Sequence, residues 1–177
     1  METKKIISLL SYLKNEKAET EIKDMEIIDD TILRVEGWDY YVLTDEEREE
    51  IFKDQQLALW DDMGLESFSS SFVDEVLNYC LNEEKLYYLS QYELIEYNEE
   101  TQEDETLGAS YGYVNPIEYI YKEIDSKTAS EIITKYDLLD FEELCKRVAM
   151  WDGYAPTLAR YDGEEIELGE YYAYLIG

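Results

Sequence analysis

The chain has 177 residues, of which 44 are Asp or Glu and 15 are Lys or Arg, so its formal net charge at pH 7 is −29. Proteins that bind nucleic acids or anionic membranes directly use a surplus of Lys and Arg, so both functions are disfavoured. The absence of histidine removes the commonest general base and the usual zinc and haem ligand. With 45% hydrophobic and 14% aromatic residues, the chain can still form a folded core.

The first 23 residues differ from the rest in charge. They contain five Lys and four Glu, whereas residues 24–177 contain 40 acids and ten bases. Apolar residues at near-helical spacing from Ile6 to Leu13 predict an amphipathic helix that packs on the body or pairs with a second copy. We therefore expect 1–23 to be a structural element or a homodimer contact, and 24–177 to be a single acidic domain. No apolar run has the length of a membrane span, and the segment lacks a signal-peptide cleavage site, which predicts a cytoplasmic protein.

An early β-hairpin and a capped helix are expected next. Residues 32–35 and 38–43 are rich in β-branched and aromatic side chains on either side of Glu36-Gly37. Thr44 and Glu47 form a T-x-x-E capping box, so a helix should follow Thr44 and run to about Asp62, with Gly64 ending it. Its expected buried side consists of Ile51, Phe52, Gln55, Leu59 and Trp60.

Helices dominate the middle of the chain. Apolar spacing predicts helices over 72–81 after a serine run, over 125–136, and from Asp140, whose pairing with Glu143 is a capping pattern. Residues 93–105 contain seven acids and no base. They belong to the stretch KLYYLSQYELIEYNEETQEDETLGASYGY (85–113), whose first part fits a helix or a strand, and 98–112 is expected to be a loop.

The tail predicts two or three antiparallel strands, with turns at Asp162-Gly163 and Gly169. The expected fold class is therefore α+β: an N-terminal helix, an early β-hairpin, central helices and a C-terminal antiparallel hairpin.

Few residues suggest chemistry. Cys80 and Cys145 lie in apolar helical patterns and are expected to be reduced core thiols. The chain has no phosphate-binding glycine loop, no nucleophile elbow and no EF-hand pattern, so we expect no cofactor and no dedicated metal site. Among so many carboxylates, no spacing marks out a catalytic pair.

The acidity itself is the strongest feature. A charge of −29 exceeds several-fold the value of about 2 to 8 that keeps a small domain soluble, and it equals the charge on roughly 50 Å of duplex DNA. Adaptation to high salt is the other common cause, but the excess of Glu over Asp disfavours it. A basic groove on a partner protein explains such a charge. The expected contacts are the acids of residues 93–105 and those flanking the capped helix: Glu93, Glu96, Glu99, Glu100, Glu103, Asp104, Glu105, Asp45, Glu46, Glu47, Asp61 and Asp62.

Two segments carry a resemblance. WDYYVLTDEEREE (Trp38–Glu50) and DGYAPTLARYDGEEIELGEYYAYLIG (Asp152–Gly177) resemble small acidic proteins of phages and mobile elements, which share a hairpin-to-helix entry and a terminal hairpin. The chain departs from them at Ala155 or Pro156, where they carry His, and at its end, where they often carry Arg. The resemblance implies a shared scaffold and a phage origin. In charge and size the chain is also similar to the DNA-mimic antirestriction and anti-CRISPR inhibitors.

These features predict a non-enzymatic inhibitor of a host defence nuclease. It would act in the host cytoplasm as an acidic nucleic-acid mimic inside the basic DNA- or RNA-binding groove of a Cas or restriction nuclease. One alternative is an acidic regulatory or assembly protein that binds another basic phage or host protein. A second is a nuclease-type enzyme that uses carboxylates and a divalent metal.

Overall fold

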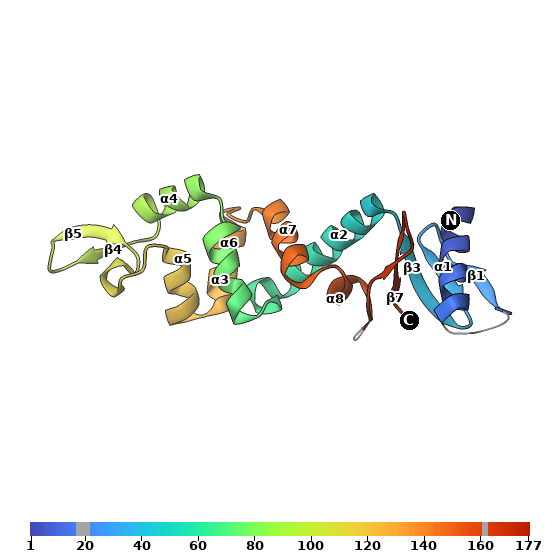
Figure 1. The fold of residues 1–177 in the computed structure, drawn as a ribbon. Coiled ribbons are helices and arrows are strands. Elements are labelled where there is room, and N and C mark those ends of the chain that lie inside the picture. The colour runs from blue at the N-terminus through green and yellow to red at the C-terminus, as the bar shows by residue number, and fades with distance from the viewer. Residues whose placement is uncertain (17–21, 161–162) are drawn as a thin grey trace. The chain divides into compact units, whose positions relative to one another are not determined.

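The computed structural model describes residues 1–16, 22–160 and 163–177, and Figure 1 shows its helices and strands. The fold is α+β, as the sequence predicts. By its contacts the chain divides into two compact units. Unit 1 comprises Met1–Gln56 and Val148–Gly177, and unit 2 comprises Leu57–Arg147. This division does not follow the change in charge at residue 23.

Unit 1 contains a five-stranded antiparallel sheet in the order β1-β2-β3-β7-β6. Both expected hairpins are confirmed, whereas β1 and the short helix α8 were not predicted. Glu36 and Gly37 both have positive φ, 51° and 83°, as a two-residue turn between twisted strands requires. The elements are α1 (Thr3–Glu16), β1 (Met25–Ile27), β2 (Ile32–Val35), β3 (Trp38–Leu43), most of α2 (Asp45–Met63), the end of α7 (Phe141–Asp152), α8 (Ala155–Leu158), β6 (Ile166–Glu167) and β7 (Tyr172–Leu175).

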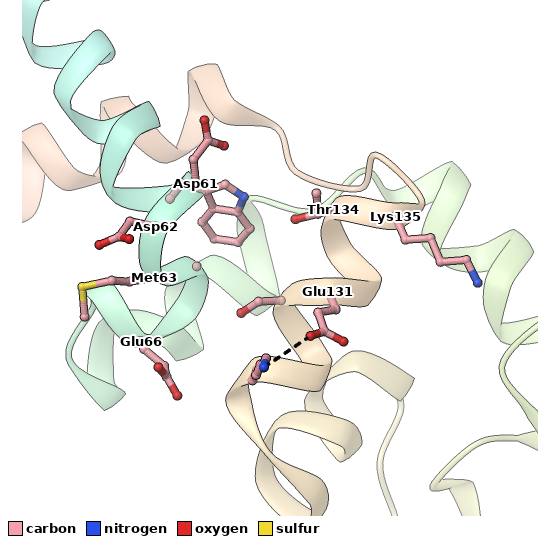
Figure 2. A pocket seen from close by; sticks show the side chains of 11 residues that line it. Asp61, Asp62, Met63, Glu66, Glu131, Thr134 and Lys135 are labelled. Carbon is pink, nitrogen blue, oxygen red and sulfur yellow. Dashed lines mark ion pairs between the residues drawn. The ribbon is translucent and has the colours of Figure 1, made fainter.

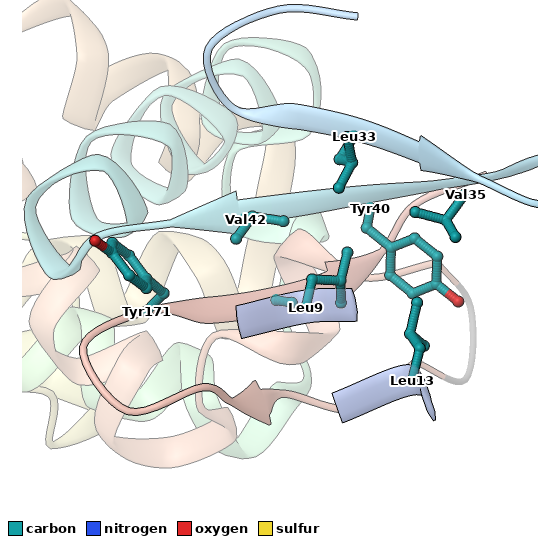
Figure 3. Packing of buried hydrophobic residues seen from close by; sticks show 8 residues of the cluster. Leu9, Leu13, Leu33, Val35, Tyr40, Val42 and Tyr171 are labelled. Atoms are coloured by element: carbon teal, nitrogen blue, oxygen red, sulfur yellow. The ribbon is translucent and has the colours of Figure 1, made fainter. Parts of the chain in front are cut away.

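Helix α1 covers one face of this sheet. Leu9 and Leu13 are buried against Leu33, Val35 and other side chains of the strands, and Figure 3 shows α1 beside them. The helix is amphipathic because its apolar residues recur every three or four positions. Of the two roles expected for the N-terminal helix, the structure shows packing on the body.

Helix α2 begins at its predicted cap, Thr44. The row of side chains that it buries differs from the expected one. Phe52 and Trp60 are buried as predicted, but Leu59 is 40% exposed, so its expected burial is wrong. Arg48 and Gln56 are buried instead, four residues before and after Phe52. Positions four apart follow one side of a helix closely, and Gln56 can be buried because its amide donates to Thr157 Oγ1 at 2.8 Å.

Unit 2 is mainly helical, and its predicted helix starts are confirmed. Ser69, Asp125 and Asp140 each accept a hydrogen bond from a backbone N–H in the first turn that follows. The elements are the end of α2, η1 (Gly64–Ser67), α3 (Ser70–Tyr79), α4 (Glu83–Tyr92), β4 (Ile95–Asn98), β5 (Glu103–Thr106), η2 (Ala109–Tyr111), α5 (Pro116–Tyr119), η3 (Ile120–Ile124), α6 (Ser126–Lys135) and most of α7.

The prediction of a loop over 98–112 is wrong in part, because this range contains a strand. Strand β5 (Glu103–Thr106) lies within it and pairs antiparallel with β4 (Ile95–Asn98), so only residues 99–102 form the connecting turn. Strand β5 consists of Glu103, Asp104, Glu105 and Thr106, so it has no apolar residue and none of the hydrophobic alternation from which a strand is predicted.

Two further expectations concern particular residues. Cys80 and Cys145 are both buried thiols, as predicted, and burial raises the pKa of the Cys80 thiol to about 12. In the tail, Gly169 has a φ of 81° between β6 and β7, which confirms that turn. Asp162 of the other expected turn lies outside the described residues.

Candidate partner-binding surfaces

The seven acids of residues 93–105 are placed by one hairpin of unit 2 and the residues beside it. In the register of this hairpin, Ile95 lies opposite Thr106 and Asn98 lies opposite Glu103. The side-chain oxygen of Asn98 accepts hydrogen bonds from two backbone N–H groups of the turn, at 2.9 and 3.4 Å, and so shapes it. Glu93 connects the hairpin to α4. We define α4 and the β4–β5 hairpin, residues 83–106, as the acidic arm (Figure 1).

Two of the seven acids have partners within unit 2. Glu96 accepts hydrogen bonds from the Gly108 backbone at 3.0 Å and from Ser110 Oγ at 3.3 Å. Glu105 accepts from the side chains of Asn98 at 2.9 Å and Thr101 at 3.0 Å. These two acids are half-buried and help to hold the hairpin. The other five are exposed: Glu93, Glu99, Glu100, Glu103 and Asp104.

Some acids of the acidic arm lie at positions where a negative charge destabilises a strand pair or a helix end. Glu96 lies directly opposite Glu105 in the ladder, and like charges in that position repel. Glu93 caps the C-terminal end of α4, where the helix dipole is negative and a carboxylate is unfavourable. The exposed Glu93 therefore contributes charge to the surface rather than stability to the fold, and the hydrogen bonds of Glu96 and Glu105 offset their mutual repulsion.

At the start of α2, in unit 1, Glu47 is held by internal contacts. It completes the capping box, since its carboxylate accepts from Thr44 N at 2.7 Å and its own N–H donates to Thr44 Oγ1 at 3.2 Å. The same carboxylate pairs with Lys5 Nζ at 2.5 Å. Burial alone would raise the pKa of Glu47, but the hydrogen bonds from Lys5 and Thr44 outweigh it and the pKa is lowered.

Asp45 and Glu46, the other two acids of this turn, differ in their surroundings. Asp45 pairs with Arg48, which lies three residues further along α2. Glu46 is exposed and has no hydrogen-bond or ion-pair partner among the described residues. Of the three expected contacts here, Glu46 is therefore the one most available to a partner.

At the end of α2, in unit 2, Asp61 and Asp62 border a groove of about 660 Å³. Glu66 of η1 and Glu131 of α6 add two more carboxylates, as Figure 2 shows. Lys127 and Lys135 also line it, and Lys127 lies 4.0 Å from Glu131. The lysines make this groove less negative than the hairpin.

The expected contacts therefore form three groups. The seven acids of residues 93–105 are brought together by the hairpin, and Asp61 with Asp62 lies at the groove, both within unit 2. The acids of the capping turn belong to unit 1, where Asp45 and Glu47 have internal ion pairs.

Exposed tyrosines lie in the same part of unit 2 as the acids of residues 93–105. None of them is among the contacts expected from the sequence. In the part of the chain that the structure describes, all exposed tyrosines fall between residues 79 and 111. On α4, Tyr88 is 54% and Tyr92 is 67% exposed, and Glu84 precedes Tyr88 by four residues. The four-residue spacing of these three residues was visible in the sequence and places them along one side of a helix. The exposed tyrosines are Tyr79, Tyr87, Tyr88, Tyr92, Tyr97 and Tyr111.

Comparison with protein-family models, curated proteins and solved structures finds no match to this chain. Within 1–16, 22–160 and 163–177, no helix combines the length and apolar character needed to cross a bilayer. In the same ranges, no three Cys, Asp or Glu side chains gather as a metal site would require.

Proposed function

We propose that the protein is a phage-derived inhibitor of a host defence nuclease, of the anti-CRISPR or antirestriction kind. It occupies a basic nucleic-acid groove of that nuclease as an acidic mimic and acts without catalysis. The observation that carries the proposal is the acidic arm, where five exposed carboxylates lie together on one hairpin and its helix junction.

The charge density of the hairpin supports this proposal. Four residues of an antiparallel strand span about 14 Å, and duplex DNA of that length carries roughly eight phosphate charges. The hairpin and its turn carry six acids over residues 96–105 and no base. A groove that recognises phosphates by Arg and Lys therefore meets a comparable charge here, and long-range attraction speeds the encounter.

The proposal can be tested by competition with DNA. A Cas9-type nuclease loaded with guide RNA and a restriction endonuclease are each mixed with labelled target duplex and increasing amounts of the protein, at low and moderate salt. We expect DNA binding to be lost at stoichiometric protein with at least one of the two nucleases, and the effect to weaken as salt screens the charges. Turnover at substoichiometric protein would instead support the enzyme, and retention of DNA by both nucleases at low salt would contradict the proposal.

The acidic arm is tested by removing charge without changing shape. The variant Glu99→Gln, Glu100→Gln, Glu103→Gln, Asp104→Asn should weaken inhibition on the order of tenfold or more, because four exposed charges are lost from one surface. A matched control removes four exposed charges from unit 1: Glu49→Gln, Glu50→Gln, Asp54→Asn and Asp152→Asn. Equal effects of the two variants would mean that total charge matters and the arm does not.

A further inference from the structure

Most arginine side chains of this protein share one kind of contact, in which the guanidinium group lies over an aromatic ring. Three of the four arginines have the guanidinium group over an aromatic ring. The guanidinium carbon of Arg48 lies 3.7 Å from the ring centre of Tyr172 and 4.1 Å from that of Tyr154, and its nitrogens pair with Glu165 and Asp45. The planar cation is thus stacked on rings and paired with carboxylates at its edge.

Arg147 of unit 2 repeats the arrangement. Its guanidinium carbon lies 4.3 Å from the ring centre of Tyr79. Its nitrogens pair with Glu75 and Glu143, both at 2.8 Å. A tyrosine ring with a nearby carboxylate is therefore a receptor for arginine that this fold uses in both units.

The outer side of α4 presents the same components without a cation. Glu84, Tyr88 and Tyr92 follow one another at four-residue steps, so they lie in a row along the helix. The ring centres of Tyr88 and Tyr92 are 5.0 Å apart. Among the described residues no Lys or Arg lies over either ring. The neighbouring Lys85 is engaged elsewhere, since its ammonium group contacts Asp137 at 2.6 Å.

We infer that the row Glu84, Tyr88 and Tyr92 receives arginine side chains of the partner, so that the acidic arm binds arginine-rich surfaces in preference to lysine-rich ones. The inference rests on the proposed function for the class of partner, a basic protein surface. The net charge selects a basic surface, but both Lys and Arg satisfy it. A planar guanidinium stacks on a ring while its edge bonds a carboxylate, whereas the more strongly hydrated ammonium group of Lys does this less well. The rings therefore add discrimination that charge alone lacks.

The test uses deca-arginine and deca-lysine peptides as probes of equal charge. Their dissociation constants with the full chain are measured by titration calorimetry at one moderate salt concentration. We expect tighter binding of deca-arginine, with each ring contributing roughly a two- to fivefold preference. The variant Tyr88→Leu, Tyr92→Leu should lose most of this preference with little change for deca-lysine. An unchanged arginine-to-lysine ratio in that variant would overturn the inference.

Two further variants separate the possible outcomes. Tyr88→Phe with Tyr92→Phe keeps both rings and should keep the preference, which shows that stacking, and not the hydroxyl groups, is responsible. The four-acid variant of the hairpin should weaken both peptides by the same factor. If the acid variant weakens both but the leucine variant changes nothing, the charge-based function stands and the arginine row is wrong. If the acid variant weakens neither, the charge-based function fails, while the leucine variant still decides on the row.

Discussion

Glu47 shows how a single acid in this chain serves the fold. Its carboxylate closes the capping box with Thr44 and pairs with Lys5, whose side chain is almost fully buried at 2% exposure. The pair connects α1 to the first turn of α2, so two segments that are distant in sequence depend on one carboxylate. A buried ammonium group without such a partner would be costly.

We predict that Glu47→Gln lowers the free energy of unfolding at pH 7 by about 1 to 3 kcal/mol, because it leaves Lys5 without its counter-charge. The folded-state pKa of Glu47 lies below its ordinary value of 4.5, so its contribution is present above pH 4.5. That contribution is lost as the pH falls through the lowered pKa. Urea unfolding of both proteins between pH 3 and 7 measures the difference. Glu46→Gln, an exposed change in the same turn, is the control, and an equal effect of the two would refute the assigned role.

The hairpin of the acidic arm is an element that forms although none of its strand residues is fully buried. It has two strands, and the residues facing each other include like charges. Part of its order comes from the turn, where Asn98 binds two backbone N–H groups and Gln102 N donates to Asn98 O at 2.8 Å. The hydrogen bonds of Glu96 and Glu105 supply more. Gln102 adopts a φ of 58°, the left-handed region that favours glycine.

The variant Gln102→Gly is expected to stabilise the hairpin by up to about 1 kcal/mol, since it removes left-handed strain at an exposed side chain. Amide hydrogen exchange of β4 and β5 reports this locally and should slow by up to about fivefold. Asn98→Ala, which removes the side-chain bonds of the turn, should have the opposite effect. Faster exchange in Gln102→Gly would show that the turn gains more from the glutamine than it loses through strain.

At the scale of the whole molecule, the net charge dominates. Unit 1 carries 22 acids and nine bases, and unit 2 carries 22 acids and six bases, so both units repel themselves. The ion pairs that offset this repulsion are mostly at the surface, where each contributes little. The chain therefore keeps a charge that its own stability does not favour, as a surface selected for a basic partner would.

We predict that potassium chloride raises the melting temperature between 0.05 and 0.5 M, because screening weakens the repulsion more than it weakens the surface ion pairs. Each kcal/mol of repulsion removed should raise it by about 2 to 4 °C for a chain of this length. Calorimetry at pH 7 measures the shift. The four-acid variant of the hairpin should respond less, and a melting temperature that falls with salt would show that ion pairs outweigh repulsion.

The sequence by itself determined the starts of α2, α3, α6 and α7, the two hairpins of unit 1 and the α+β class, whereas α4, α5 and α8 were not predicted. Caps at Thr44, Ser69, Asp125 and Asp140 depend on hydrogen bonds within three residues, and turns such as Glu36-Gly37 depend on two, so these features can be predicted from short segments. The net charge, and with it the expected class of partner, also needs no coordinates.

Only the tertiary structure decided which residues face solvent and which serve the fold. It buried Gln56 and exposed Leu59, made a strand of Glu103–Thr106, and gave Glu47, Glu96 and Glu105 internal partners while leaving Glu99 and Glu100 exposed. The burial of Gln56 and the ion pair of Glu47 depend on segments that are distant in sequence, since Thr157 contacts Gln56 and Lys5 contacts Glu47. The partners of Glu105 are near in sequence, but the position of each side chain still follows from the register of the hairpin. Local spacing contains no information about such contacts, because burial is a property of what the rest of the chain places over a residue.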